Sequence, residues 1–355
     1  MTCFIADSKK SCTFEGKIAK ILLMKSIMTT VAFLLLTFSC SHAQQPSTSD
    51  DYYRQADGKK GAQLKTALCG IIYNRTELSY DDLWKAFFST DVREDGKIWD
   101  MYSNATNFTP VTKGSNYSKE GDCYNREHSW PNSWFGGKVM PMYTDLHHLY
   151  PTDGYVNNRR SNYPFGETKG ERYKSANNFS KLGACTYAGY TGIVFEPNDE
   201  YKGDFARTYF YMVTCYEEKL ANWYQNYTES RPTIDGSTYP GLTSWQLEML
   251  MKWAAQDPVS QKEVDRNNAV YEIQHNRNPF IDYPGLEQYI WGDLKDKVFS
   301  YDHYEATAIR TIRQQDDAKP SKDVWTTDGK RSTKSRRDIN IVKKKNGKAV
   351  KVIKR

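Results

Sequence analysis

A guanidinium group, a carboxylate and an imidazole follow one another in the segment Arg126-Glu127-His128. A carboxylate is a ligand that a hard cation such as Mg²⁺ prefers, and Mg²⁺ keeps several waters, so it needs few protein ligands. A histidine is the side chain that most easily takes a proton from water near neutral pH. Together with an arginine that can contact a phosphate, these residues indicate hydrolysis of a phosphodiester.

A second polar segment follows about twenty residues later. It begins at Asp145 and ends at Pro151, and an Asn-Asn-Arg-Arg run starts at Asn157. The pattern predicts a first strand that ends near residues 127–128, a second strand over 145–149, and a helix that Thr152 or Asp153 caps. Residues three apart in a helix share a face. Asn157 and Arg160 would therefore present a metal-binding carboxamide and a phosphate-binding guanidinium together.

Glu127 and His128 are adjacent in the first predicted strand, and His147 and His148 are adjacent in the second. Successive side chains of a strand point to opposite faces. We therefore predict a local irregularity that lets Glu127 and His128 reach one site. For the same reason, at least one of His147 and His148 is expected to belong to the scaffold, while the other could orient His128 or a water.

The rest of the chain predicts one compact α+β domain that is largely helical, over residues 50–310. Capping boxes at Ser79/Asp82, Thr243/Gln246 and Ser260/Glu263 mark three helix starts. Apolar spacing predicts helices near residues 64–72, 83–88, 205–223, 247–253, 260–274 and 286–291, and alternation predicts a strand over 97–102.

The charge is divided unevenly. The chain of 355 residues carries a formal charge of +6, but residues 319–355 hold 14 Lys and Arg against 3 Asp and Glu, a net charge of +11. The other 35 basic and 40 acidic residues give −5. The tail is either a polyanion-binding segment or a solvated extension that serves secretion or attachment. Asn346-Gly347 predicts a weak hairpin within it.

The beginning of the chain resembles an export signal. Lys25 precedes an apolar run over residues 29–38, and Ser41-His42-Ala43 resembles a cleavage site. We interpret residues 1–43 as a leader, with residues 1–23 as a mis-assigned start. The run is too short to span a bilayer. Cys40 follows a sequence that departs from a lipobox, so secretion or periplasmic delivery is favoured over a lipid anchor.

Four cysteines lie beyond the leader, namely Cys69, Cys123, Cys185 and Cys215. In an oxidising compartment they allow three pairings. Four buried free thiols are the alternative, and the sequence does not decide between them.

Four blocks of sequence resemble the bacterial endonuclease I family. They read REHSWP…SWF, DLHHLYPTDGYVNNRRSNYPFG, FEPNDEYKGDFARTYFYM and NNAVYEIQHNRNPFIDYP, in order within residues 60–295. This resemblance implies an exported nuclease whose core is a ββα-metal (His-Me finger) motif. It implies that His128 is the general base, and that Glu127 and Asn157 hold one divalent ion, usually Mg²⁺, for which Mn²⁺ or Ca²⁺ can substitute.

The resemblance also implies a substrate and leaves one role open. The substrate would be DNA, and RNA as well, bound through its phosphate backbone with little sequence preference. Cleavage would leave 5′-phosphates, and the enzyme would be a monomer. Some family members hold the phosphate with an arginine between the two strands, where this chain has none. Arg126 or Arg160 would take that role. The alternative function is a catalytically inactive surface protein that binds nucleic acid or other polyanions.

Overall fold

The computed structural model describes residues 51–304 and the short stretches 324–325, 331–332, 339–343 and 349–353. The predicted leader, Cys40 and the Asn346-Gly347 turn lie outside these residues. Within them, no helix is both long and apolar enough to cross a membrane.

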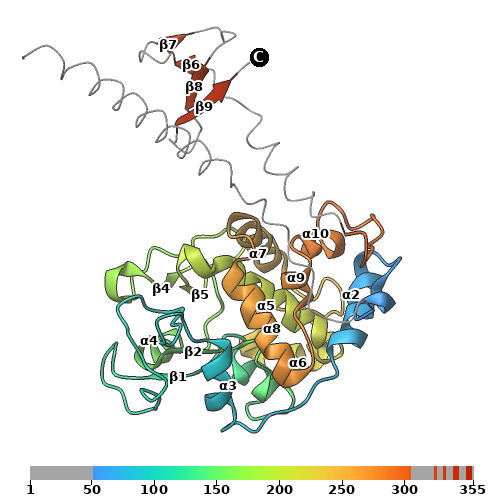
Figure 1. Ribbon diagram of the computed structural model, residues 1–355. Helices are drawn as coiled ribbons and strands as arrows, with labels where there is room; N and C mark the ends of the chain where they lie inside the picture. The colour runs from blue at the N-terminus through green and yellow to red at the C-terminus, as the bar shows by residue number, and fades with distance from the viewer. Residues whose placement is uncertain (1–50, 305–323, 326–330, 333–338, 344–348, 354–355) are drawn as a thin grey trace, which may run out of the picture. The chain divides into compact units, whose positions relative to one another are not determined.

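Residues 51–304 form a mixed α and β structure, as predicted (Figure 1). The helices are α2 (Gly61–Ile72), α3 (Leu83–Thr90), α4 (Gly154–Arg160), α5 (Lys202–Cys215), α6 (Leu220–Asn226), α7 (Ser244–Gln256), α8 (Gln261–Gln274), α9 (Pro279–Asp282) and α10 (Leu286–Ile290). The strands are β1 (Tyr124–His128), β2 (Leu149–Asp153), β3 (Tyr173–Lys174), β4 (Lys181–Ala184) and β5 (Ile193–Glu196).

Helix α5 is the centre of the core. Every residue from Lys202 to Cys215 is buried, and α2, α7 and α9 pack against the helix. A helix that is buried on all sides must pair its charged groups. Arg207 does so with Glu263 of α8, through bonds of 2.5 and 2.9 Å.

A smaller apolar cluster holds the elements around β1 together. Leu83 and Phe87 of α3 pack with Tyr124 of β1, Leu149 of β2 and Val270 of α8. This cluster fixes α3 beside the two-stranded sheet, so residues from both elements share one surface.

The two sheets of this part are antiparallel. β1 pairs with β2, with Glu127 opposite Tyr150 and His128 opposite Leu149. The other sheet has the order β3-β4-β5. Beyond residue 304, β6 (Val324–Trp325), β7 (Arg331–Ser332), β8 (Ile339–Lys343) and β9 (Ala349–Ile353) form a sheet of order β7-β6-β8-β9. The pairing of β8 with β9 confirms the predicted hairpin strands.

Two predicted strands are wrong. Residues 145–148 form turns, and the second strand starts only at Leu149, because the Asp145 carboxylate accepts a hydrogen bond from the His147 amide and closes a turn. Residues 97–102 contain only an isolated bridge at Ile98. The Asp100 carboxylate accepts a hydrogen bond from the amide of Tyr102, and the chain bends there instead of continuing as a strand. Pro151 is tolerated in β2 because a two-stranded sheet leaves each strand an open edge.

The predicted long helix over 205–223 is also wrong in extent. Helix α5 ends at Cys215, and α6 begins at Leu220 after a short 3-10 turn at residues 217–219. The predicted helices near residues 64–72, 83–88, 247–253 and 286–291 correspond to α2, α3, α7 and α10.

All four cysteines within residues 51–304 are free thiols. Burial raises the pKa of Cys69 to about 12 and that of Cys215 to about 11, so both stay protonated at neutral pH. The structure therefore favours the free-thiol interpretation over a disulfide pairing.

The capping box that begins α8 gives a first testable prediction. The Ser260 hydroxyl accepts from the amide of Glu263, and the Glu263 carboxylate accepts from the amide of Ser260 at 2.8 Å. We expect Ser260→Ala to lower the free energy of unfolding by about 1 kcal/mol, because a helix amide loses its partner. Chemical denaturation measures this change. Ser115→Ala, in an exposed loop, is the control, and an equal effect of both changes would contradict the prediction.

Candidate active site

The order strand, strand, helix brings Glu127 of β1 together with Asn157 and Arg160 of α4. β2 leads directly into α4, whose N-cap is Asp153, as predicted. Its carboxylate accepts from the amide of Val156 at 2.9 Å and from the amide of Gly121 at 2.7 Å. α4 packs against both strands, so its inner face meets the end of β1.

Glu127 is buried at the meeting point of β1 and α4, with 3% of its surface exposed. Its Oε1 accepts from the Tyr102 hydroxyl at 2.7 Å and from Nη1 of Arg160 at 2.9 Å. Burial raises the pKa of Glu127, whereas Arg160, Tyr102 and a hydrogen bond from Asn157 act in the opposite direction. These contacts support the charged form that a cation ligand needs.

Asn157 lies beside this carboxylate. Its Nδ2 donates to Oδ1 of Asn125 at 2.7 Å, and it lies close enough to lower the pKa of Glu127, so the two predicted ligands are neighbours. A carboxylate with neighbouring carboxamide oxygens is a donor set that suits Mg²⁺. The described residues hold no cluster of three or more His, Cys, Asp or Glu side chains able to bind a metal ion. A cation that keeps most of its waters needs no such cluster.

His128 is fixed in one tautomer. Its Nε2 lies 3.0 Å from the backbone oxygen of Tyr143. A carbonyl oxygen can only accept, so Nε2 carries the proton and Nδ1 has a free lone pair. Burial, with smaller contributions from the neighbouring His148 and Arg126, lowers the pKa of His128 to about 3. The ring is therefore neutral and can accept a proton at Nδ1.

The ring of His128 is also held by stacking. Tyr143 lies parallel to it, with 5.2 Å between ring centroids and 15° between planes, and Phe135 meets it edge-on at 6.3 Å. Trp130 and Trp134 are fully buried. The orientation of the base is thus set by the folded core.

The predicted irregularity in β1 is absent. β1 pairs with β2 in unbroken register through His128. Glu127 faces Tyr102 and Arg160, whereas His128 faces Tyr143. The two side chains leave the strand on opposite sides at its very end.

Arg160 shares the inner face of α4 with Asn157, as predicted, but it is only 1% exposed. Besides Glu127, its guanidinium donates to the backbone oxygens of His128 at 3.0 Å and Ser129 at 2.6 Å. One side chain thereby holds three consecutive residues at the end of β1.

Arg126 lies nearer the surface, with 15% of its side chain exposed. Its guanidinium lies over the ring of Tyr80 at 3.5 Å and over that of Trp84 at 4.3 Å. Nη1 donates to the backbone oxygen of Tyr80 at 2.6 Å, and Asp81, 3.3 Å away, is almost fully exposed.

The two other candidate histidines are buried in the core. His147 contacts the backbone oxygen of Asn276 at 3.2 Å, and His148 contacts that of Met142 at 2.7 Å. The His148 ring lies 5.5 Å from that of His128. Asp145 stabilises this turn, because it accepts from Tyr216 and Tyr211 and forms an ion pair with Arg75.

Three contributors escaped the sequence analysis. Asn125 directly precedes the segment Arg126-Glu127-His128, and its carboxamide could have been recognised as a possible contact of Asn157. Tyr102 reaches Glu127 from a distant loop, and Tyr143 acts through its backbone oxygen. Neither the contact of Tyr102 nor that of Tyr143 can be recognised from a sequence motif.

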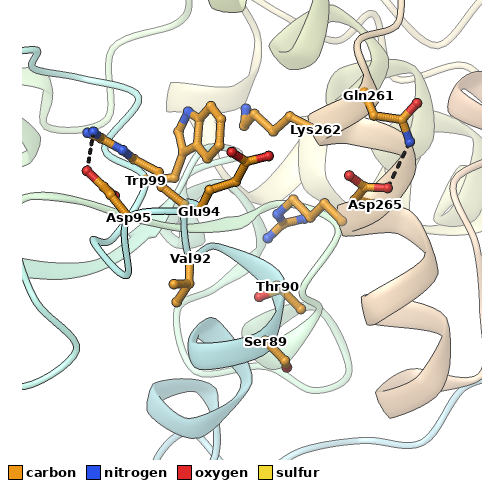
Figure 2. Close-up of a pocket in the computed structure, with 11 residues that line it drawn as sticks. Ser89, Thr90, Val92, Glu94, Asp95, Trp99, Gln261, Lys262 and Asp265 are labelled. Carbon is orange, nitrogen blue, oxygen red and sulfur yellow. Dashed lines mark hydrogen bonds and ion pairs between the residues drawn. The ribbon is translucent and has the colours of Figure 1, made fainter.

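A separate hollow of about 580 Å³ lies where the end of α3 and the loop after it face the start of α8 (Figure 2). Its charged groups are mostly paired: Arg93 contacts Asp95 at 2.7 Å, and Gln261 donates to Asp265 at 2.8 Å. None of Glu127, His128 and Asn157 lines it. The hollow is therefore not part of the candidate site.

Comparison with known proteins assigns the family. Residues 60–285 match the endonuclease I family over more than half of the chain. The chain belongs to the endonuclease I family. The match includes β1, β2 and α4 and ends before the basic tail, and membership makes the chain a nuclease, an enzyme that hydrolyses phosphodiester bonds.

Individual proteins that are similar to this chain are also named as nucleases. An extracellular ribonuclease of Bacillus amyloliquefaciens is 39% identical over 251 residues, 68% of this chain and 78% of the relative. An extracellular ribonuclease of Bacillus subtilis is 38% identical over 263 residues, 72% of this chain and 83% of the relative. An extracellular deoxyribonuclease of Aeromonas hydrophila is 28% identical over 143 residues, 40% of this chain and 50% of the relative.

Proposed function

We propose that this endonuclease I family member is an exported, Mg²⁺-dependent endonuclease with a His-Me finger core. The observation that carries the proposal is the neutral His128 with an unprotonated Nδ1, one residue from a buried carboxylate that Asn157 contacts. A general base and a site for a divalent cation are the two parts that such a hydrolysis requires.

In this proposal each residue has a separate task. His128 accepts a proton at Nδ1 from the water that attacks phosphorus, while the Tyr143 oxygen keeps Nε2 protonated and the ring oriented. Glu127 and Asn157 hold the ion, which when bound would neutralise charge on the phosphate and on the leaving oxygen. Cleavage at the 3′ oxygen leaves 5′-phosphates.

Of the two candidate arginines, the geometry favours Arg126 for contact with a phosphate. Its one ion-pair partner in residues 51–304, Asp81, is exposed to water, and pairs of this kind are weak and easily exchanged. Arg160 instead compensates Glu127 and holds the backbone. Arg160 thus acts as a positioning residue in this proposal.

The substrate is proposed to be both RNA and DNA. The two Bacillus relatives are named ribonucleases and the Aeromonas relative a deoxyribonuclease. Contacts to the phosphate backbone carry no base information, which accounts for weak sequence preference. The same names support export. The proposal takes residues 1–43 as a leader, 50–310 as the catalytic domain and 319–355 as a basic tail of a monomer, and it favours secreted or periplasmic delivery over a lipid anchor at Cys40.

Digestion of supercoiled plasmid and of a structured RNA tests this function. With Mg²⁺ we expect nicking and then degradation of the plasmid, and cleavage of the RNA. Addition of EDTA should stop both, because the ion neutralises charge at the reacting phosphate. Restoration by excess Mg²⁺ is the control for damage by the chelator. Intact plasmid and RNA, with the plasmid still retarded on a gel, would instead indicate an inactive binding protein.

A further inference from the structure

A line of aromatic rings and cations leads from His128 towards the surface of α3. Tyr143 stacks on His128, and Tyr80 stacks on Tyr143 with 4.4 Å between centroids and 18° between planes. The guanidinium of Arg126 lies 3.5 Å from the centroid of the Tyr80 ring and 4.3 Å from that of the Trp84 ring. The base is therefore linked to α3 by continuous contacts.

The line continues along α3. Trp84 and Phe88 are four residues apart and lie on one side of the helix, about 6 Å apart along its axis. Nζ of Lys113 lies 5.4 Å from the ring of Trp84 and 5.6 Å from that of Phe88. Two rings and one cation thus form the outer end of the line.

The backbone holds Lys113 in this place. The amide of Gly114 donates to the oxygen of Tyr124 at 2.9 Å, and the amide of Tyr124 donates to the oxygen of Thr112 at 3.1 Å. The segment around Lys113 therefore runs beside the start of β1 and is fixed relative to Arg126.

The outer end is open to solvent. Phe88 is 42% exposed, Lys113 is exposed and Trp84 is half-buried. Within residues 51–304 no ion pair includes Lys113, so its charge is available to a ligand. A single exposed ring needs no explanation, but rings that alternate with cations and end at a general base fit a particular class of ligand.

Proteins that bind unpaired nucleic acid combine cations along the backbone with rings on which bases stack. We propose that Trp84, Phe88, Lys113 and Arg126, here called the aromatic–cation track, bind the single-stranded segment that adjoins the scissile phosphate. Arg126 and Lys113 contact phosphates, and Phe88 and Trp84 stack on bases. This inference rests on the proposed function and adds a preference for unpaired substrate.

The test uses two changes away from the catalytic residues, Phe88→Ala and Lys113→Gln. Tyr224→Ala is the matched control for the ring, because Tyr224 is 37% exposed and lies under Arg231 at 5.4 Å. Lys85→Gln is the matched control for the charge, because Lys85 lies on α3 with 82% of its side chain exposed. KM and kcat are measured for one oligonucleotide as single strand and as duplex.

We expect Phe88→Ala to raise KM for the single strand about tenfold, since loss of one base-stacking ring commonly has an effect of this size. Its kcat should stay within about twofold, because the change does not touch the reacting groups. KM for the duplex should change much less, since its bases are already stacked. Lys113→Gln should reduce the slope of log(kcat/KM) against log[salt] by about 0.7 for the single strand, the loss of one phosphate contact.

Three outcomes would overturn the inference. Track variants that behave as their controls would show that the track does not meet substrate. An equal rise of KM for duplex and single strand would show that the track contacts the phosphate backbone and does not stack on bases. An inactive wild-type enzyme would refute the proposed function and this inference with it, whereas an active wild type with unaffected variants refutes the inference alone.

Discussion

Cleavage of plasmid DNA is expected to slow about 100- to 10,000-fold when His128 is replaced by alanine, the range that a positioned general base contributes. The ring offers a proton-free Nδ1 because Nε2 is committed to the Tyr143 oxygen. The neighbouring rings of His147 and His148 are not expected to replace it, since backbone oxygens of Asn276 and Met142 hold them in the core. Initial rates of nicking measure the effect.

Loss of a buried ring also affects stability, and a matched variant separates the two effects. His147 is as buried as His128 and likewise contacts one backbone oxygen. We expect each alanine variant to lose about 1–3 kcal/mol from the carbonyl left without a donor, in addition to any cavity term. His147→Ala should nevertheless keep its activity within about tenfold at a temperature where it is folded.

Comparable rates for wild type and His128→Ala would exclude this histidine as the base. Equal losses in the two histidine variants would point to disrupted packing, and thermal unfolding curves of both proteins would show it. A selective loss in His128→Ala, with the fold intact, is the expected result.

The second large effect is expected from Glu127→Gln. The carboxamide keeps an acceptor for Tyr102 and nearly the same volume but removes the negative charge that a divalent cation requires. We expect affinity for Mg²⁺ or Mn²⁺ to fall at least about 100-fold, more than the usual loss when only a partner of a ligand is changed. Calorimetric titration with Mn²⁺ measures this without reliance on activity.

The substitution also leaves Arg160 without its counter-charge in a buried place. Breaking a buried ion pair from one side costs about 3–5 kcal/mol. Glu263→Gln is the matched control, because Glu263 is equally buried and pairs with Arg207. Both variants should lose stability, but Glu263→Gln should keep its metal affinity and its dependence on the ion.

A Glu127→Gln protein that binds Mn²⁺ as tightly as the wild type would remove Glu127 from the metal site. If the Glu263→Gln protein loses affinity for the ion to the same extent, general destabilisation of the fold would explain both results. Denaturation curves recorded beside the titrations distinguish these cases.

Much of the candidate site could be predicted because its signals are local. The end of the first strand at His128, the cap at Asp153, and the shared face of Asn157 and Arg160 follow from residue type and spacing. Each depends on neighbours within a few positions, which a single sequence displays directly.

The remainder depends on contacts between distant segments. The turn at residues 145–148 replaces a strand because Asp145 is held by Arg75, Tyr211 and Tyr216, which come from other elements. The partner of His128 is a backbone oxygen, and every residue has one. The inward direction of Arg160 depends on the burial of Glu127, which spacing does not reveal.

The four free thiols have a consequence for how this part of the chain reaches its native state. Residues 51–304 contain no covalent cross-link, so the free energy of folding there does not depend on the thiol–disulfide potential of the surroundings. Packing, hydrogen bonds and buried ion pairs close the long loops between α2, β1 and α8. Folding of this part of the chain therefore involves no formation or reshuffling of disulfides.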